Sequence, residues 1–187
     1  MRHQVLKMMD GRSVLSGAMA GRKLLTALIS ATPPSDAPIA AFLDFKGVAV
    51  ATTSFLREAV IGFRDYVRLS LANIYPVAAN LEPAVLEELE FFLRARNDVF
   101  WICDLDKTER VNHARLLGDL DPTQRATFDA VRELGAVTAP ELATRFPNQN
   151  IGPTAWNNRL SGLAAKGLLV ERKLGKTKSF SPLLEIA

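Results

Sequence analysis

The chain has 187 residues, of which 48% are hydrophobic and 23% charged, and its formal net charge is +3. These proportions are ordinary for a soluble globular protein, and the length suits one medium-sized domain or two small ones. No apolar run reaches the ~18–20 residues that span a bilayer, and residues 1–21 lack the continuous apolar segment of a signal peptide. The single cysteine, Cys103, excludes an internal disulfide and a cysteine-based zinc site, so we expect a cytoplasmic protein without a membrane segment.

The positive charge is confined to the end of the chain. Residues 1–120 carry 14 basic and 14 acidic side chains, whereas residues 151–187 carry six basic and two acidic ones. A basic segment on a neutral body indicates a part that binds a polyanion, although a solvated basic surface would give the same count.

The first 120 residues alternate apolar runs with amphipathic stretches, and a loop rich in proline separates two of them at residues 31–38. We predict strands at residues 5–9, 39–45, 75–80, 98–105 and 111–120. We predict helices at residues 14–29, with Ser13 as N-cap, at 54–71, and at 83–95, with Pro83 in the first turn. This β-α-β-α-β-α-β-β order predicts a mixed sheet covered by helices.

The pattern changes at Asp121, where a second domain begins. Three amphipathic helices are predicted at residues 121–135, 139–146 and 153–167. Two alternating strands follow at residues 168–173 and 178–183, joined by LGKT as a basic hairpin. Three helices followed by a basic hairpin are typical of the winged variant of the helix-turn-helix.

Residues 137–180 resemble the winged-helix DNA-binding domains of bacterial regulators. The most specific part is the apolar-periodic third helix, its glycine stop and the following GLLVERK at 167–173. The resemblance implies that the third helix enters the major groove of DNA while the hairpin, or wing, lies along the backbone.

The polar face of the predicted third helix agrees with a role in DNA binding. Trp156, Leu160 and Leu163 are spaced for burial, so the opposite face is polar. Asparagine can bond adenine edges bidentately, threonine or serine can bond several bases, and cations neutralise phosphates. The predicted DNA-contacting residues are Thr154, Asn157, Asn158, Arg159 and Ser161 on the helix and Arg172, Lys173, Lys176 and Lys178 on or beside the wing.

The segment LDFKGVAVATTSFL, residues 43–56, is similar to the STAS family. Anti-sigma-factor antagonists of that family carry a strand of L-D-h-S-G-V type followed by D-S-S-G-L at a helix start, matched by Leu43, Asp44, Gly47, Val48, Ser54 and Leu56. STAS-like bacterial domains of unknown function carry D-F-x-G-V…S-F-x-x-E, matched by Asp44, Phe45, Gly47, Val48, Ser54, Phe55 and Glu58. The resemblance implies a STAS-like α/β fold for residues 1–120.

In the antagonists a partner kinase phosphorylates the serine that follows the motif's aspartate, and partner binding is lost. Thr53 stands at that position, so the resemblance implies a phospho-switch at Thr53 or the adjacent Ser54. The sequence departs from the motif, because Thr52 replaces the aspartate and Phe55 replaces the glycine. The residues themselves favour a simpler role, in which Thr53 or Ser54 caps the helix and Glu58 lies in its first turn.

Few residue patterns suggest catalysis. Asp104, Asp106 and Thr108 form D-x-D-x-T, which resembles the first motif of haloacid-dehalogenase phosphatases, with the first aspartate as nucleophile and the second as acid/base. The chain beyond Thr108 is too short to complete a magnesium site, so we favour a polar turn between two strands. His3 and His113 each stand alone, Cys103 lies in an apolar strand, and no phosphate-binding glycine pattern occurs. We therefore expect no enzymatic activity and no cofactor or metal.

These patterns predict a cytoplasmic bacterial transcriptional regulator of two domains. Residues 1–120 would form the STAS-like α/β domain, which dimerises or senses a partner or signal. Residues 121–187 would form the winged helix-turn-helix domain, which binds double-stranded DNA. The alternative is a protein-interaction switch of anti-sigma-antagonist type that makes no contact with DNA.

Overall fold

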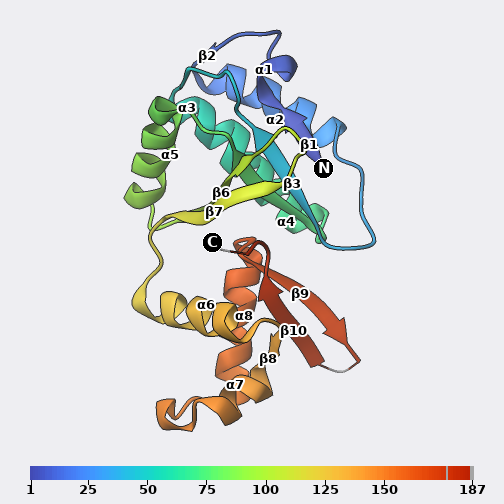
Figure 1. Ribbon diagram of the computed structural model, residues 1–187, viewed down its shortest axis with the longest axis vertical. Helices are drawn as coiled ribbons and strands as arrows, with labels where there is room; N and C mark the ends of the chain where they lie inside the picture. Colours follow the sequence, from blue (N-terminus) through green and yellow to red (C-terminus); the bar gives the residue numbers. More distant parts are fainter. Residues whose placement is uncertain (176, 186–187) are drawn as a thin grey trace. The chain divides into compact units, whose positions relative to one another are not determined.

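The computed structural model describes residues 1–175 and 177–185 (Figure 1). Within these residues the chain divides into two compact units, residues 1–119 and residues 120–185. Each unit has its own secondary structure and its own core, and each is described by itself below.

The first unit is a mixed α/β structure built on a five-stranded sheet. Its strands are β1 (Arg2–Gln4), β3 (Ile39–Asp44), β5 (Ile74–Ala79), β6 (Val99–Leu105) and β7 (Val111–Gly118), in the order β1-β3-β5-β6-β7. The first four strands are parallel, and β7 is antiparallel to β6. The mixed α/β class and the mixed sheet predicted from the sequence are confirmed.

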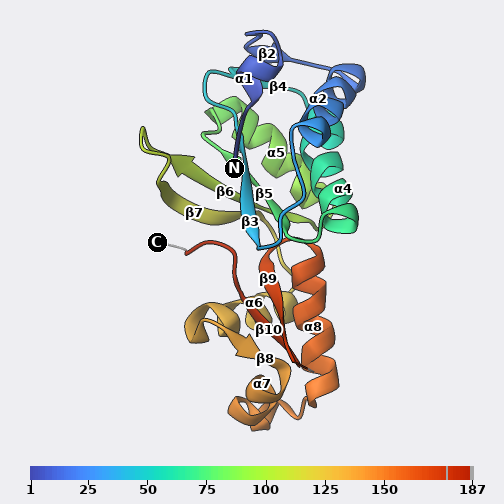
Figure 2. The ribbon, with the colours of Figure 1, turned by 90° about the vertical axis from the view of Figure 1, so that its right-hand side faces the viewer.

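The helices of this unit cover one face of the sheet. They are α2 (Ala18–Ser30), the continuous helix of α3 (Thr53–Leu56), η1 (Arg57–Ile61) and α4 (Gly62–Ser70), and α5 (Pro83–Ala95). Successive parallel strands step across the sheet in one direction, and right-handed crossovers of this kind place every connecting helix on the same side. Figure 2 shows α2, α4 and α5 together on one side of β3, β5 and β6.

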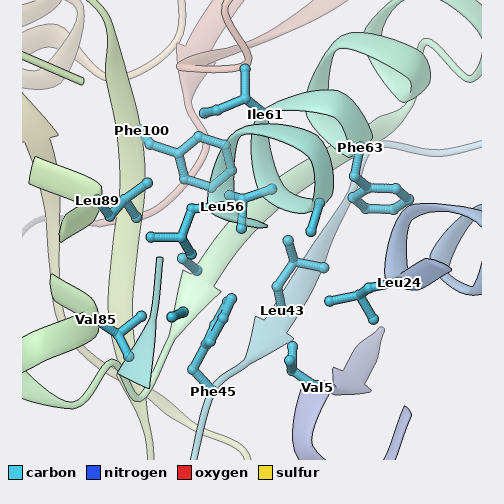
Figure 3. Close-up of a cluster of buried hydrophobic side chains, with 14 of the residues drawn as sticks. Val5, Leu24, Leu43, Phe45, Leu56, Ile61, Phe63, Val85, Leu89 and Phe100 are labelled. Atoms are coloured by element: carbon cyan, nitrogen blue, oxygen red, sulfur yellow. The ribbon is translucent and has the colours of Figure 1, made fainter. Parts of the chain in front are cut away.

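The core of the first unit lies between these helices and the sheet. Figure 3 shows Leu43 and Phe100 from the strands meeting Leu24, Leu56 and Leu89 from three helices. All five side chains are buried. Burial of aliphatic and aromatic side chains is the main term that stabilises a fold of this size.

The sequence-based prediction is wrong at the start of the chain. The apolar run at residues 5–9 is not a strand, because β1 ends at Gln4 and α1 (Val5–Met8) follows. Asp10 and Gly11 adopt left-handed backbone angles, and the Gly11 amide donates to the carbonyl of Leu6 over 2.8 Å. This hydrogen bond closes a helical turn, as in common helix C-termini.

The next helix also begins later than predicted. β2 (Val14–Leu15) pairs in parallel with β4 (Val50–Ala51), and Gly17 has a φ of +83° that a helix cannot continue through. The helix therefore starts at Ala18, and Ser13 is not its cap; the carbonyl of Ser13 instead accepts from the amides of Ala49 and Val50.

The second unit combines three longer helices with a three-stranded antiparallel sheet (Figure 1). Its elements are α6 (Pro122–Leu134), β8 (Val137–Thr138), α7 (Ala139–Arg145), η2 (Pro147–Gln149), α8 (Pro153–Ala165), β9 (Leu169–Leu174) and β10 (Thr177–Pro182). The sheet order is β8-β10-β9, and the two-residue strand β8 was not predicted as a strand. Phe128, Leu142, Trp156 and Phe180 are all buried and form the interior of this unit.

Two helices of the second unit have well-formed N-terminal caps. The Asp121 carboxylate accepts from the Gln124 amide over 2.8 Å at the start of α6. At the start of α7, Thr138 and Glu141 form a reciprocal capping box. Among the described residues, no helix of either unit combines the length and apolar character needed to cross a membrane.

Candidate functional site

Three of the predicted DNA-contacting residues, Thr154, Asn157 and Lys178, line one depression of the second unit. The depression has a volume of about 390 Å³ and is lined by residues of α7, α8 and β10: Ala139, Pro140, Pro153, Thr154, Asn157, Thr177 and Lys178. The first turn of α8 and the beginning of β10 are therefore side by side, although 23 residues separate Thr154 from Thr177 in the sequence.

The orientation of α8 follows from its apolar spacing. Trp156, Leu160 and Leu163 are buried, as their helical spacing predicts. Thr154 and Asn158 are exposed one turn apart on the opposite face. Asn157 is half-buried and lies in the wall of the depression.

Arg159 and Ser161 are placed differently from these three residues. The Arg159 guanidinium carbon lies 5.4 Å from the centre of the Trp156 ring, a cation–π distance, and the side chain is half-buried. The Ser161 hydroxyl oxygen is buried and makes no hydrogen bond in the structure. The Ser161 hydroxyl therefore points into the unit. The prediction that Ser161 faces outward is wrong in this respect.

The β9–β10 hairpin, which is the predicted wing, carries its cations on two faces. Lys173 and Lys178 are directly opposite each other across β9 and β10, and Arg172 is opposite Ser179 on the other face. Lys178 lies two residues before the buried Phe180, so both side chains project from the same face of β10. The ammonium group of Lys178 is 2.8 Å from the carboxylate of Glu171. Arg172 and Lys173 are exposed. Lys176, also predicted to contact DNA, lies outside the described residues.

The hydroxyl segment of the first unit caps its helix differently from the prediction. Thr52, and neither Thr53 nor Ser54, occupies the N-cap position of α3, and its hydroxyl makes no capping bond to that helix. The Thr52 hydroxyl instead accepts from the Gly17 amide over 3.1 Å and lies 3.2 Å from the Ser54 hydroxyl. These contacts tie the turn before α3 to the start of α2.

Thr53, the predicted phospho-switch position, faces another helix. Its hydroxyl donates a hydrogen bond to the carboxylate of Glu88 on α5. A phosphate on Thr53 would remove this donor and place a dianion beside a carboxylate. Modification here would therefore weaken the contact between α3 and α5, a consequence that the sequence alone did not indicate.

This geometry allows a test of the switch hypothesis. Thr53→Glu is expected to lower the free energy of unfolding by about 1 kcal/mol, because it removes one hydrogen bond and opposes two carboxylates. The same change in a Glu88→Gln background should cost less, since the repulsion is absent. Chemical denaturation of the wild type, Thr53→Glu, Glu88→Gln and the double variant measures the coupling between the two positions. Equal losses of unfolding free energy in both backgrounds would contradict the contact between Thr53 and Glu88. If Thr53→Glu alters neither stability nor DNA or partner binding, the switch hypothesis fails.

Glu58, a motif residue of the same helix, is held by two arginines. Its carboxylate lies 3.0 Å from Arg22 of α2 and 2.8 Å from Arg57, and the hydrogen bonds from Arg22 and then Arg57 lower its pKa. The neighbouring Gly21 of α2 allows the close approach, because a Cβ there would lie 2.7 Å from the carbonyl oxygen of Phe55. Glu58 therefore joins two closely packed helices.

A polar network at the carboxyl ends of β3 and β5 was missed by the sequence analysis. Asp44, with a side chain only 3% exposed, accepts from Arg2 over 2.7 and 2.9 Å and from the Asn80 amide over 2.7 Å. Its second oxygen also accepts from the Lys46 backbone amide, and Arg2 bonds Glu109 over 2.8 Å. A single carboxylate in an apolar strand was the available signal, because a buried charge needs partners.

The D-x-D-x-T residues lie around the β6–β7 turn. One Asp106 oxygen accepts from the Thr108 amide and hydroxyl and from the Arg110 amide, and the bond to the Thr108 side chain is the main cause of its lowered pKa. Asp104 pairs with His113 over 2.8 Å at a bulge in β7. Asp106 and Thr108 thus stabilise a polar turn, as the sequence favoured.

The other titratable candidates are buried. Burial raises the pKa of Cys103 to about 12, so its thiol is protonated at neutral pH. Burial lowers the pKa of His3, whose Nε2 lies 3.1 Å from the hydroxyl of Thr32. Among the described residues, no group of three or more His, Cys, Asp or Glu side chains could hold a metal ion.

Comparison with known proteins gives no match to this chain, either among protein-family models or among curated proteins.

Proposed function

We propose that the protein is a DNA-binding transcriptional regulator. In this proposal the second unit is a winged helix-turn-helix domain that binds duplex DNA, and the first unit is a STAS-like domain that mediates dimerisation or senses a partner or signal. The observation that carries the proposal is the depression shared by α8 and β10, where Thr154 and Asn157 of the helix adjoin Lys178 of the wing.

The side chains on this surface suit duplex DNA, which combines anionic phosphates with base edges that form hydrogen bonds. The exposed hydrogen-bonding side chains of α8 are neutral, whereas the wing adds exposed Arg172 and Lys173. An α-helix fits the major groove, and neutral amide and hydroxyl groups can bond base edges there. Cations on the wing would be at the level of the phosphate backbone in this arrangement.

The wing also carries a stability cost that a polyanion would offset. Lys173 and Lys178 are directly opposed across the two strands, and like charges in this position destabilise a sheet. Glu171 forms an ion pair with Lys178. Phosphate groups placed beside the wing would neutralise both, so this charge arrangement supports the proposal.

Salt dependence of duplex binding tests the proposal. Each phosphate contact contributes about 0.9 to the slope of log affinity against log salt concentration, so Lys173→Gln/Lys178→Gln should reduce the slope by about 1.8. The matched control, Arg125→Gln/Arg132→Gln, removes two exposed charges from α6 and should leave the slope unchanged. Fluorescence anisotropy with labelled random-sequence duplex between roughly 50 and 200 mM salt measures both. Absence of binding at low salt would overturn the proposal and favour the protein-interaction switch.

Dimerisation is the role proposed for the first unit, since symmetric pairs commonly read specific DNA sites. The helices of the unit expose large apolar side chains, of which Met19 (76%), Leu69 (88%) and Phe91 (71%) are the most exposed. Covering exposed apolar side chains at a dimer interface would remove them from water, which favours association. Light scattering at micromolar concentration should find a dimer, and a monomer would leave partner or signal sensing as the role of this unit.

A further inference from the structure

The outward face of α8 offers few groups that could read DNA bases. Its exposed residues are Pro153, Thr154, Ala155, Asn158, Gly162 and Ala165. Only Thr154 and Asn158 among them carry a side chain that forms hydrogen bonds. The face therefore presents one hydroxyl and one carboxamide, and no positive charge.

The other polar residues of α8 are already engaged or turned away. Arg159 lies over the Trp156 ring, and the Ser161 hydroxyl is buried. Asn157 is half-buried in the depression with Lys178, towards the wing. The residues free to face a groove are thus Asn158 and, one helical turn earlier, Thr154.

The hydrogen-bonding groups that α8 exposes restrict which base it can recognise. Guanine presents two acceptors to the major groove and calls for two donors, which arginine or lysine supplies. Adenine presents one acceptor and one donor, which a carboxamide matches with its own donor and acceptor. Thr154 can bond either kind of base and can contact the methyl group of thymine.

Small residues around Asn158 suit a short side chain that must reach a base edge. Ala155 and Gly162 flank it on the exposed face, and a Cβ added at Gly162 would meet no atom within 4 Å. An asparagine extends much less far than an arginine, so the helix backbone has to approach the bases closely. The absence of bulk beside Asn158 permits that approach.

On the basis of the proposed function, we propose that α8 selects an A·T base pair through Asn158, with Thr154 contacting the adjacent base pair. The recognised half-site then contains an adenine that cannot be replaced by guanine without loss of affinity. Sequence selection lies in these two residues, and the wing contributes affinity that is independent of sequence.

Selection of bound duplexes from a random-sequence pool tests this inference. The full chain should enrich one adenine position, and Asn158→Ala should reduce the preference for that adenine roughly 5- to 100-fold. Asn158→Arg should shift the preference at the same position towards guanine. As the matched control, Arg172→Gln should weaken binding to all sequences alike and keep the adenine preference.

The outcomes distinguish a failure of adenine selection by Asn158 from a failure of the proposed DNA-binding function. If the wild-type chain binds duplex DNA in a salt-dependent way but enriches no adenine, or if Asn158→Ala leaves the enrichment unchanged, the inference is overturned and the proposed function stands. If the wild-type chain retains no duplex from the pool at low salt, the proposed function fails and the inference fails with it. Circular dichroism of each variant establishes that its overall helix content equals that of the wild-type chain in these comparisons.

Discussion

Replacing Asp44 with alanine is expected to lower the free energy of unfolding by about 3 kcal/mol, because the change removes a buried carboxylate that pairs with the partly buried Arg2. The Asp44 carboxylate accepts four hydrogen bonds, two of them from Arg2. Its removal leaves Asn80 and the Lys46 amide without their acceptor and leaves Arg2 with only the exposed Glu109. Donors left unpaired in this partly buried site account for much of the expected loss.

The measurement can be confined to the first unit. The chain has two tryptophans, Trp101 in the first unit and Trp156 in the second, and both are buried. In a Trp156→Phe background, urea denaturation followed by fluorescence reports the unit that contains Asp44. Glu109→Ala serves as the control, because it removes an outer partner of Arg2 and keeps the Arg2–Asp44 pair. A loss for Asp44→Ala no larger than that of the control would contradict the structural role of the network.

The longer elements could be predicted because their burial pattern is continuous. The helix at Pro83–Ala95 has the bounds that its apolar spacing and its proline predict, and β3 ends within one residue of its prediction. The short elements could not be predicted in this way. α1 has four residues, and β2, β4 and β8 have two each, which is too few for a periodic signal. Their conformation is decided by pairing partners and by left-handed residues such as Gly17.

The candidate DNA-binding residues of α8 could be placed from the sequence only where the burial pattern is clear. The period of Trp156, Leu160 and Leu163 is enough to place Thr154 and Asn158 outward. Arg159 and Ser161 lie at the border of the buried face, where a difference of a few degrees decides between solvent and interior. Their actual positions depend on the neighbouring side chains, such as the Trp156 ring beneath Arg159.

Contacts between distant residues were beyond the reach of the sequence. Arg2 and Asp44 are 42 residues apart, and Thr53 and Glu88 are 35 apart. The chain contains many arginines and glutamates of similar local context, so only the order of the strands and the face of the helices select these partners. The hydroxyl segment illustrates the effect, because the tie between Thr52 and Gly17 follows from the pairing of β2 with β4.

The Gly118→Ala variant is expected to lose about 3–4 kcal/mol of folding free energy, from two separate causes. Gly118 ends β7 with a φ of +90°, which an alanine adopts only with strain. A Cβ at this position would also lie 2.3 Å from the carbonyl oxygen of Asp98 and 3.1 Å from the Cβ of Leu93. The first neighbour is backbone, so it cannot turn away as a flexible side chain would.

The clash would spread because Asp98 holds an important contact of the core. Its carboxylate lies 2.8 Å from Arg64, and the two side chains are only 15% and 10% exposed. Arg64 also donates to the carbonyl of Val99 at the start of β6. Displacing the Asp98 backbone therefore weakens a largely buried ion pair as well as the β6–β7 pairing.

A second glycine separates the strain from the clash. Gly135 has a φ of +79° and a ψ of −118°, but a Cβ there would meet no atom within 4 Å, so Gly135→Ala should cost about 1–2 kcal/mol from strain alone. Gly118→Ala is measured in the Trp156→Phe background and Gly135→Ala in a Trp101→Phe background, so that fluorescence reports the unit that carries each change. Equal losses would mean that backbone strain alone explains both positions and would exclude the close contact with Asp98. A loss at Gly118 that exceeds the loss at Gly135 by 2 kcal/mol or more, roughly the cost of overpacking a core, would instead locate that contact as the main constraint on the end of β7.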